Sequence, residues 1–474
     1  MPSRKDQLHS YQFMMQRVTS SVMVHETDPE QTPLRRGVGA VVGGVMIAAL
    51  VAVIFGIVGV LTNVGGTSWK ADGAVIIERE TGATYVYQDE MLQPTLNYAS
   101  ARLISGNQDA ETHRVAGSSL QEVPRRPTVG IPGAPTSLPE SEYATTGPWT
   151  MCSVPGEDVA GAPTTNTTLL IGENPTGGTR LGERAVLVRD SETGDPYLIW
   201  RSHRYPIGGE PASTIRSLYG ANRTPVEVGT AWLNGLPTGQ EIGPIAVENL
   251  GQPSSAVPEH RIGDVVFHPV SGGEQHYLVR DDGLAPATEL QVRILEGQYS
   301  VTPQRIAPLL ANEAPTKDVL APPPGQAAPP QQTPPLAAQS ADGPPPLCSV
   351  AADAATAPSI LIDSDVSTLE DGIETTQESG SGTRLADRVL VPAGRVAVVQ
   401  AMPSSSAETG AYNIVTDLGL RFPVPNEELL ASLGYEPNSA VQLPASLVQR
   451  IPAGPTLDPA AARQPAPISG PDGR

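Results

Sequence analysis

Histidines and acidic residues are the side chains of this 474-residue chain that could bind a metal ion or move a proton. His260, His268 and His276 lie eight residues apart, in sequence typical of loops and strands, which disfavours a shared metal site. The acidic residues fall in expected turns and strand edges, where we interpret them as solvated surface groups: Glu78, Glu80, Asp190, Glu192, Asp281 and Asp282. No catalytic residue, metal or cofactor is predicted from them.

Motifs for phosphate binding and hydrolysis are missing from the sequence. None of the patterns GxxxxGK(S/T), GxSxG and HExxH occurs. A glycine-rich stretch at residues 65–70 ends in Lys70, but its glycine spacing differs from that of a phosphate loop, and we interpret it as a flexible joint. These patterns favour a non-enzymatic protein, although an enzyme is not ruled out.

One apolar segment predicts a membrane anchor. Residues 38–61 carry no charge and are long enough, at 1.5 Å per helical residue, to cross a bilayer of about 30 Å. Arg35 and Arg36 precede the segment and the first cation after it is Lys70, which places residues 1–37 in the cytoplasm and the rest outside. A cleaved signal peptide, the alternative, would have a shorter apolar region nearer the N-terminus.

Two features suggest contacts within and before the anchor. Gly39 and Gly43 form a GxxxG pattern that allows close helix pairing, although glycine is also common in membrane helices. Before the anchor, apolar residues recur at helical spacing and predict an amphipathic helix that docks on a protein partner, with the membrane surface as the alternative. These residues are Leu8, Tyr11, Met15, Val18 and Val22.

The composition bounds the remaining part of the chain. The net charge of -20 argues against a nucleic-acid partner, which requires a basic face. The 2 cysteines exclude a zinc-ribbon or disulfide-dense scaffold. Cys152 and Cys348 share a Cys-Ser-Val context outside the membrane, so we predict a disulfide between them, with two free thiols as the alternative.

Four segments outside the membrane repeat one order of residues. Each has a β-rich run, a glycine turn, a tyrosine, a proline, a helical stretch and a closing glycine. Tyrosine and proline are nine residues apart in the first three copies and eleven apart in the fourth. We interpret each unit as a β-hairpin followed by a helix, with the proline ending the second strand and the glycine ending the helix, unless the similarity is chance. The pairs are Tyr85 and Pro94, Tyr197 and Pro206, Tyr277 and Pro286, and Tyr412 and Pro423.

The repeats and the inserts between them predict the domain organisation. Both inserts contain Cys-Ser-Val followed by Gly-Thr-Arg-Leu and are interpreted as halves of one central domain. The fold class is α+β: a single N-terminal transmembrane helix, then an extracytoplasmic region of four β-hairpin/helix repeats around a central β-rich domain. The predicted parts are the repeats 72–125, 185–245, 262–312 and 395–456, the central halves 148–190 and 347–394, a Pro-rich linker 315–346 and a disordered tail 457–474.

Several longer motifs resemble a known family. Residues 76–82 (Ile-Ile-Glu-Arg-Glu-Thr-Gly), 97–104 (Asn-Tyr-Ala-Ser-Ala-Arg-Leu-Ile) and 130–135 (Gly-Ile-Pro-Gly-Ala-Pro) carry the resemblance. Together with the N-terminal motifs, they make the chain similar to the EccB family, a single-pass membrane core component of type VII (ESX) secretion systems.

The resemblance implies a function and a set of partners. It implies a rod or arc of repeats around a β domain closed by a disulfide, assembled with EccC, EccD and EccE into a membrane complex that exports proteins. Residues 1–37 would dock on partners and the repeats would self-associate outside. Some family members have been labelled ATPases. A structural subunit is the leading hypothesis, with an atypical ATPase or a cell-wall-binding anchor as alternatives, and contact with the cell envelope stays open.

Overall fold

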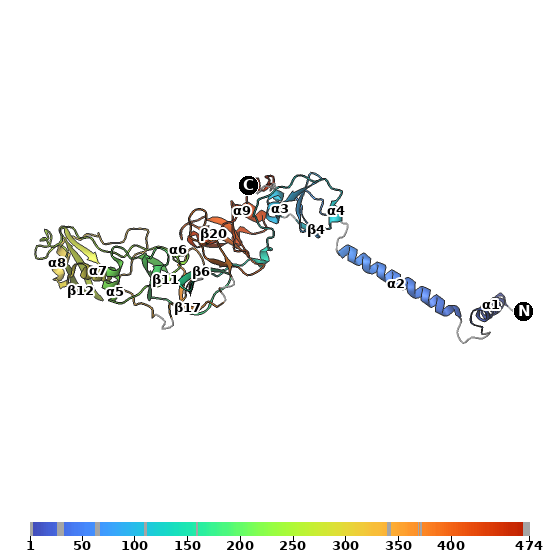
Figure 1. Cartoon of the computed structure of the whole chain (residues 1–474), viewed down its shortest axis with the longest axis horizontal. Coiled ribbons are helices and arrows are strands. Elements are labelled where there is room, and N and C mark those ends of the chain that lie inside the picture. Colours follow the sequence, from blue (N-terminus) through green and yellow to red (C-terminus); the bar gives the residue numbers. More distant parts are fainter. Residues whose placement is uncertain are drawn as a thin grey trace.

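The computed structural model describes residues 3–25, 33–61, 67–108, 111–157, 160–338, 343–367, 369 and 372–467. Helices at the N-terminal end are followed by an elongated rod of small sheets (Figure 1). Helix α1 (Arg4–Val24) begins with a capping box, in which Ser3 Oγ accepts from the Asp6 backbone and the Asp6 carboxylate accepts from the Ser3 backbone. Helix α2 (Pro33–Leu61) contains a candidate membrane span at Gly37–Ile57 with a mean hydropathy of 2.7.

The four repeats share one topology. The first three strands of each repeat form an antiparallel meander, and a fourth strand returns after a helix to pair parallel with the first. Repeat 1 contains β1 (Val75–Glu78), β2 (Thr84–Gln88), β3 (Met91–Thr95), α3 (Tyr98–Ser105) and β4 (Thr112–Val115). Repeat 2 contains β8 (Ala185–Asp190), β9 (Pro196–Trp200), β10 (His203–Pro206), α5 (Pro211–Tyr219) and β11 (Val226–Val228).

Repeats 3 and 4 follow the same order. Repeat 3 contains β12 (Val265–Val270), β13 (Gly273–Arg280), β14 (Gly283–Ala287), α7 (Glu289–Tyr299) and β15 (Gln304–Arg305). Repeat 4 contains β20 (Val396–Met402), β21 (Ala411–Thr416), β22 (Arg421–Val424), α9 (Glu427–Ser432) and β23 (Val441–Pro444). A short helix follows each fourth strand: α4 (Gly117–Leu120), α6 (Thr230–Gly235), α8 (Pro308–Glu313) and α10 (Ala445–Val448).

The predicted hairpin-plus-helix unit is therefore incomplete, and the role assigned to its proline is wrong. Pro94 does not end a strand but lies inside β3, opposite Tyr85 of β2. Pro286 likewise lies inside β14, opposite Tyr277, whereas Pro206, opposite Tyr197, is the last residue of β10. The third strand is the last of its sheet, where a residue without an N–H is tolerated. The nine-residue spacing is thus the separation in sequence between two residues that face each other in a hairpin.

The helix ends agree only in part with the expected glycine caps. Gly106 ends α3 in the left-handed region, with φ 63. Gly297, predicted to close the third helix, lies inside α7, which instead ends at Ser300 with φ 53. Among the long helices of the four repeats, three have polar N-terminal caps, because Asn97, Thr288 and Asn426 each accept a hydrogen bond from the backbone three residues ahead.

The central domain is one seven-stranded sheet built from both predicted halves. The strand order is β18-β19-β6-β5-β16-β17-β7. Residues 185–190, which the prediction placed both here and in repeat 2, form β8 of repeat 2. The strands are β5 (Trp149–Glu157), β6 (Pro163–Ile171), β7 (Thr176–Arg180), β16 (Leu347–Ala351), β17 (Ser359–Asp365), β18 (Ile373–Glu374) and β19 (Arg388–Leu390), and the short 3-10 helices η1 (Ser141–Tyr143) and η3 (Pro437–Ser439) lie in connections.

Apolar residues on both faces of the first strands explain the rod. Val396 and Val398 of β20 pack in a core shared with repeat 1, whereas Ala397 and Val399 pack in the core of the central sheet. In the same way β8 buries Val186 and Val188 toward the central sheet and Leu187 toward repeat 3. Because successive side chains of a strand point to opposite faces, a continuous apolar run joins two neighbours. The spatial order is therefore repeat 1, repeat 4, central sheet, repeat 2 and repeat 3 (Figure 1).

The Pro-rich segment 315–346 is more than a linker. Its described part lies along repeats 3 and 2 and makes isolated backbone bridges from Thr316 to Leu284, from Ala327 to Gly239 and from Leu336 to Ala185. Backbone N–H groups of the repeats donate to carbonyls of Pro335 and Gln331. Proline keeps its carbonyl acceptor, so an extended Pro-rich chain can accept hydrogen bonds from backbone N–H groups of both repeats. We call this segment the strap.

The tail prediction is wrong for residues 457–467. Leu457 and Ala462 are buried completely, and helix α11 (Pro459–Ala462) packs on α3 of repeat 1. The Gln464 carbonyl accepts a hydrogen bond from the Gly130 backbone, which joins the C-terminal segment to the segment that follows repeat 1. A composition rich in proline and alanine suggested disorder, but small side chains also allow close packing on a neighbouring repeat. Residues 468–474 of the predicted tail lie outside the described residues.

Candidate functional site: helix seams and a disulfide-bonded sheet

The histidines considered for metal binding have separate partners. The ring of His268 stacks on Tyr277 with centroids 5.8 Å apart, and that of His276 lies 5.5 Å from Phe267. His260 Nδ1 lies 3.7 Å from Asp264 Oδ2. Within the described ranges, no three histidines, cysteines or carboxylates are grouped so that they could hold a metal ion.

The carboxylates hold turns and join modules. Asp190 was interpreted as a solvated surface group, but it is 4% exposed and accepts hydrogen bonds from Thr230 Oγ1 and the Glu192 backbone. Its burial follows from its position at the end of β8, next to the start of α6. Glu192 forms an ion pair of 2.8 Å with Arg384, which joins repeat 2 to the central domain. These contacts are structural.

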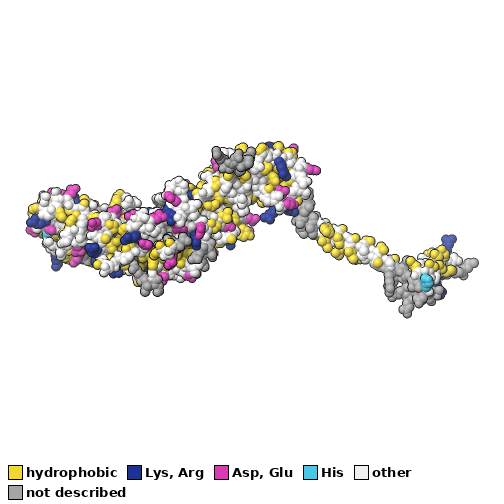
Figure 2. Space-filling view, in the orientation of Figure 1, with side chains coloured by type: hydrophobic (Ala, Val, Ile, Leu, Met, Phe, Trp, Pro, Cys, Tyr) yellow, Lys and Arg dark blue, Asp and Glu magenta, His cyan; other side chains and the backbone are white. Residues whose placement is uncertain are grey.

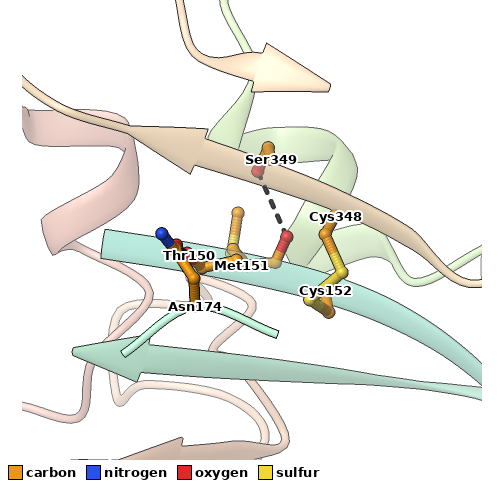
Figure 3. The surroundings of a disulfide bond; sticks show 6 residues. All are labelled: Thr150, Met151, Cys152, Asn174, Cys348 and Ser349. Atoms are coloured by element: carbon orange, nitrogen blue, oxygen red, sulfur yellow. Dashed lines mark hydrogen bonds between the residues drawn. A yellow bond between two sulfur atoms is a disulfide. The ribbon is translucent and has the colours of Figure 1, made fainter. Parts of the chain in front are cut away.

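The disulfide joins the two halves of the central sheet. Cys152 of β5 and Cys348 of β16 lie directly opposite each other in an antiparallel pair, and their sulfurs are bonded at 2.07 Å (Figure 3). Both residues are completely buried, next to Leu170 and Leu369. Beside them Ser349 Oγ donates to the Met151 carbonyl at 3.2 Å. The predicted pairing therefore closes a loop that contains repeats 2 and 3 and the strap, with a sequence separation of 196.

A buried arginine fixes the seam between repeats 1 and 4. Arg102 of α3 is 5% exposed, and its Nε donates to the Ser432 carbonyl of α9 at 2.9 Å. Tyr435 then donates from its hydroxyl to the Pro139 carbonyl at 2.7 Å, and burial raises the pKa of this phenol, which keeps it a donor. Arg102 belongs to the Asn-Tyr-Ala-Ser-Ala-Arg motif, so part of that motif serves contact between modules.

The seam between repeats 2 and 3 depends on a glycine. Helices α5 and α7 pack against each other there, and a Cβ added at Gly297 would lie 1.8 Å from Ser217 Oγ and 2.7 Å from Ser217 Cβ. Gly297 therefore serves a close approach of two helices, which the sequence analysis missed. The sequence signal for this role was a glycine three residues after Ile294, on the apolar side of α7.

We expect Gly297→Leu to open this seam. Overpacking would lower the free energy of unfolding by about 1–3 kcal/mol, offset in part by better helix propensity. Hydrogen exchange of the full chain should show faster exchange in α5 and α7. Gly380→Leu is the matched control, because no heavy atom lies within 4 Å of a Cβ there. Equal protection of α5 and α7 in both variants would contradict the assigned role.

Two candidate contact surfaces on α1 and α2 remain without a partner within the described part of this single chain. On α1, Leu8, Tyr11, Met15, Val18 and Val22 are between 50% and 71% exposed. Figure 2 shows hydrophobic side chains along both helices. On α2, a Cβ at Gly39 or Gly43 would meet no other atom within 4 Å. The predicted docking and helix-pairing roles of these residues stay predictions.

An apolar helix long enough to span a membrane, followed by a rod of four like modules around a disulfide-bonded sheet, defines a membrane-anchored scaffold protein. Residues 1–466 match the family model described as type VII secretion system ESX-1, transport TM domain B. The chain belongs to this EccB family, as its motifs predicted.

Curated relatives and solved structures extend this result. The chain is 28% identical to "ESX-3 secretion system ATPase EccB3" of Mycolicibacterium smegmatis, over 96% of this chain and 89% of the relative. It is 33% identical to "ESX-5 secretion system ATPase EccB5" of Mycobacterium tuberculosis, over 63% of this chain and 60% of the relative. A chain of an intact ESX-5 inner membrane complex matches with a TM-score of 0.61 and 26% identity, over 100% of this chain and 97% of that one.

A second structure, of an EccB3 dimer from the ESX-3 core complex, matches with a TM-score of 0.58 and 26% identity. It covers 82% of this chain and 99% of that one. The agreement extends along the rod, so the predicted fold class, an N-terminal membrane helix followed by a repeat region, is confirmed.

Proposed function

We propose that this protein is a structural subunit of a type VII (ESX) inner-membrane complex, which it anchors and helps to assemble for protein secretion. The observation that carries this proposal is the match of the whole chain to one subunit of the intact ESX-5 inner membrane complex. A rod whose buried groups are used to join modules fits such a role. In this arrangement residues 1–37 lie in the cytoplasm and the rod lies outside, as Arg35 and Arg36 favour.

The proposal assigns partners to the two exposed surfaces. The apolar side chains of α1 dock on EccC-, EccD- or EccE-type subunits. Leu8, Met15 and Val18 are exposed, and their burial in an interface would lower the free energy of the complex. Gly39 and Gly43 let α2 approach a second membrane helix closely. The rods of several copies associate outside the membrane, a role supported by the dimer found for EccB3.

Two other functions compete with this proposal. The relatives bear the name ATPase, but the chain carries no GxxxxGK(S/T) motif. The charged residues Arg102 and Glu192 described above serve contacts between modules. A cell-wall anchor would bind through the rod alone and would need no subunits of a secretion complex.

Purification of the tagged full chain from its own membranes in mild detergent tests the function. We expect large membrane proteins to co-purify with it. Leu8→Asp combined with Met15→Asp should weaken this association at least about a hundredfold, because each apolar side chain contributes about 1.5–3 kcal/mol when buried. His9→Asp combined with Gln16→Asp changes exposed residues of the same helix that do not lie at i,i+4 spacing from Leu8, Tyr11 or Met15, and is the control.

Three outcomes would contradict the proposal. The wild-type chain could purify as a lone monomer. It could hydrolyse ATP after separation from all partners and lose that activity through one substitution, which would favour the ATPase. It could bind isolated cell wall without any membrane partner, which would favour the anchor.

A further inference from the structure

Repeat 1, the first module after the membrane helix, contains a cavity beside strand β4. The cavity has a volume of about 610 Å³, which is within the range of small-ligand sites, and β4 forms one of its walls. Residues 136–140 and the pair Ser68 and Trp69 close its other sides.

The cavity lies close to the membrane surface. Six peptide bonds join Leu61, the last residue of α2, to Thr67, and at about 3.5 Å each they span at most about 21 Å. Figure 1 shows β4 and α4 at the end of repeat 1 nearest to α2. Trp69 is buried and packs edge-on against Tyr87 with ring centroids 5.7 Å apart, so the wall that it forms is fixed.

Cationic groups predominate in the lining, although the whole chain is acidic with a net charge of -20. The titratable residues there are Arg79, His113, Arg114 and Glu140, together with Tyr98. Arg79 Nε donates to the Arg114 carbonyl at 3.0 Å, and His113 Nε2 lies 3.6 Å from Glu111 Oε2. Arg114 is exposed, and within the described part of the chain no carboxylate lies at ion-pair distance from it.

The remaining lining combines apolar and hydroxyl groups. Ile77 and Leu138 are half-buried, and Tyr98 and Thr112 share a hydrogen bond of 3.1 Å between their hydroxyls. Ser118 and Ser119 add further hydroxyls. A ligand with a negative charge, hydrogen-bonding oxygens and an apolar part matches this lining. Guanidinium groups bind phosphate with particular strength, because their planar donors match two of its oxygens.

We propose that this cavity binds the phosphate of an anionic phospholipid headgroup from the leaflet in which α2 ends. Arg114 is its principal cation, and the hydroxyls of β4 and α4 contact the glycerol. Bound lipid holds repeat 1 at a fixed orientation above the bilayer. This proposal needs only the anchor and the cavity, and it is independent of the role in secretion.

The repeat architecture provides a matched control for Arg114. In repeat 1, Arg114 lies opposite Ile77 in the parallel pair of β4 with β1. In repeat 3, Arg305 lies opposite Phe267 in the equivalent pair of β15 with β12, and it is exposed as well. The two arginines thus share a position in the repeat but lie near opposite ends of the rod (Figure 1).

Hydrogen exchange of the full chain in lipid nanodiscs tests the proposal. Nanodiscs of phosphatidylcholine alone are compared with nanodiscs that also contain phosphatidylglycerol. We expect the amides of β4 to exchange about tenfold more slowly with the anionic lipid in the wild-type chain and in Arg305→Glu, since one surface cation contributes about 1 kcal/mol to anionic lipid binding and the hydroxyls add to it. Arg114→Glu should abolish the difference, and Arg114→Gln should reduce it.

A second arm separates the lipid from a free anion. Soluble dihexanoyl phosphatidylglycerol should protect β4 in phosphatidylcholine nanodiscs, whereas inorganic phosphate at the same concentration should not. Equal protection by inorganic phosphate would overturn the lipid assignment. Protection that survives in Arg114→Glu, or that is also lost in Arg305→Glu, would overturn the site. Arg114→Gln keeps the test valid if the charge reversal alone unfolds repeat 1.

Discussion

The double variant Cys152→Ala/Cys348→Ala is expected to unfold at a clearly lower denaturant concentration than the wild-type chain. The disulfide closes a loop with a sequence separation of 196, and in the chain-entropy model a loop of this size contributes about 5 kcal/mol. Alanine is chosen because both positions are completely buried beside leucines, where a serine hydroxyl would lack a partner. Circular dichroism of the full chain in detergent measures the midpoint.

A reductant provides the control for this experiment. Reduction should move the unfolding midpoint of the wild-type chain to that of the double variant and should leave the variant unchanged. The loss should be largest for the central sheet, because β5 and β16 carry the two cysteines. Coincident midpoints for oxidised wild type and variant would show that the cross-link contributes nothing to the stability of the rod.

Trp149→Ala is expected to destabilise the protein strongly. Trp149 is completely buried in a core that joins the central sheet to repeats 2 and 4 through residues such as Val188 and Val399. Loss of a large buried aromatic side chain costs about 3–5 kcal/mol. The thermal midpoint of the full chain should fall accordingly, and exchange should quicken in β8 and β20, on both sides of the sheet.

Two further variants separate packing from hydrogen bonding at this position. The indole nitrogen of Trp149 has no hydrogen-bond partner within the described part of the chain. Trp149→Phe should therefore cost less than the alanine variant, since it retains much of the packing and removes an unsatisfied donor. Trp200→Ala is the matched control, because Trp200 is only partly buried and stacks with Arg201. A similar loss at Trp200 would contradict the special role of the central core.

Several elements could be predicted from the sequence because their signals are local. The uncharged run at residues 38–61 is one such signal. The nine-residue spacing from Tyr85 to Pro94, which recurs from Tyr277 to Pro286, is another. The matching contexts of Cys152 and Cys348 were a further local signal, and they identified the disulfide partners 196 residues apart. The hydrophobic core positions of the first strands follow from their continuous apolar runs.

Other elements depend on contacts between distant segments. The fourth strands are two to four residues long, such as Gln304–Arg305, and they pair only because a helix returns them to the first strand. Leu457 is buried in a core to which repeats 1 and 4 both contribute, and Gly297 is required because Ser217 approaches it. The cavity at Arg114 likewise combines residues 68–69, β4 and the segment 136–140, which no short motif reports.

The out-and-back path of the chain has a mechanical consequence. Repeats 2 and 3 are inserted between the two halves of the central sheet, so two chain segments, one before β8 and the strap after α8, connect the far end of the rod to the rest. A pulling force on repeat 3 is shared between these segments, and both converge on the bond between Cys152 and Cys348. The rod therefore resists tension as a loop closed by the disulfide. While the disulfide is intact, a force that extends one segment also acts on the other.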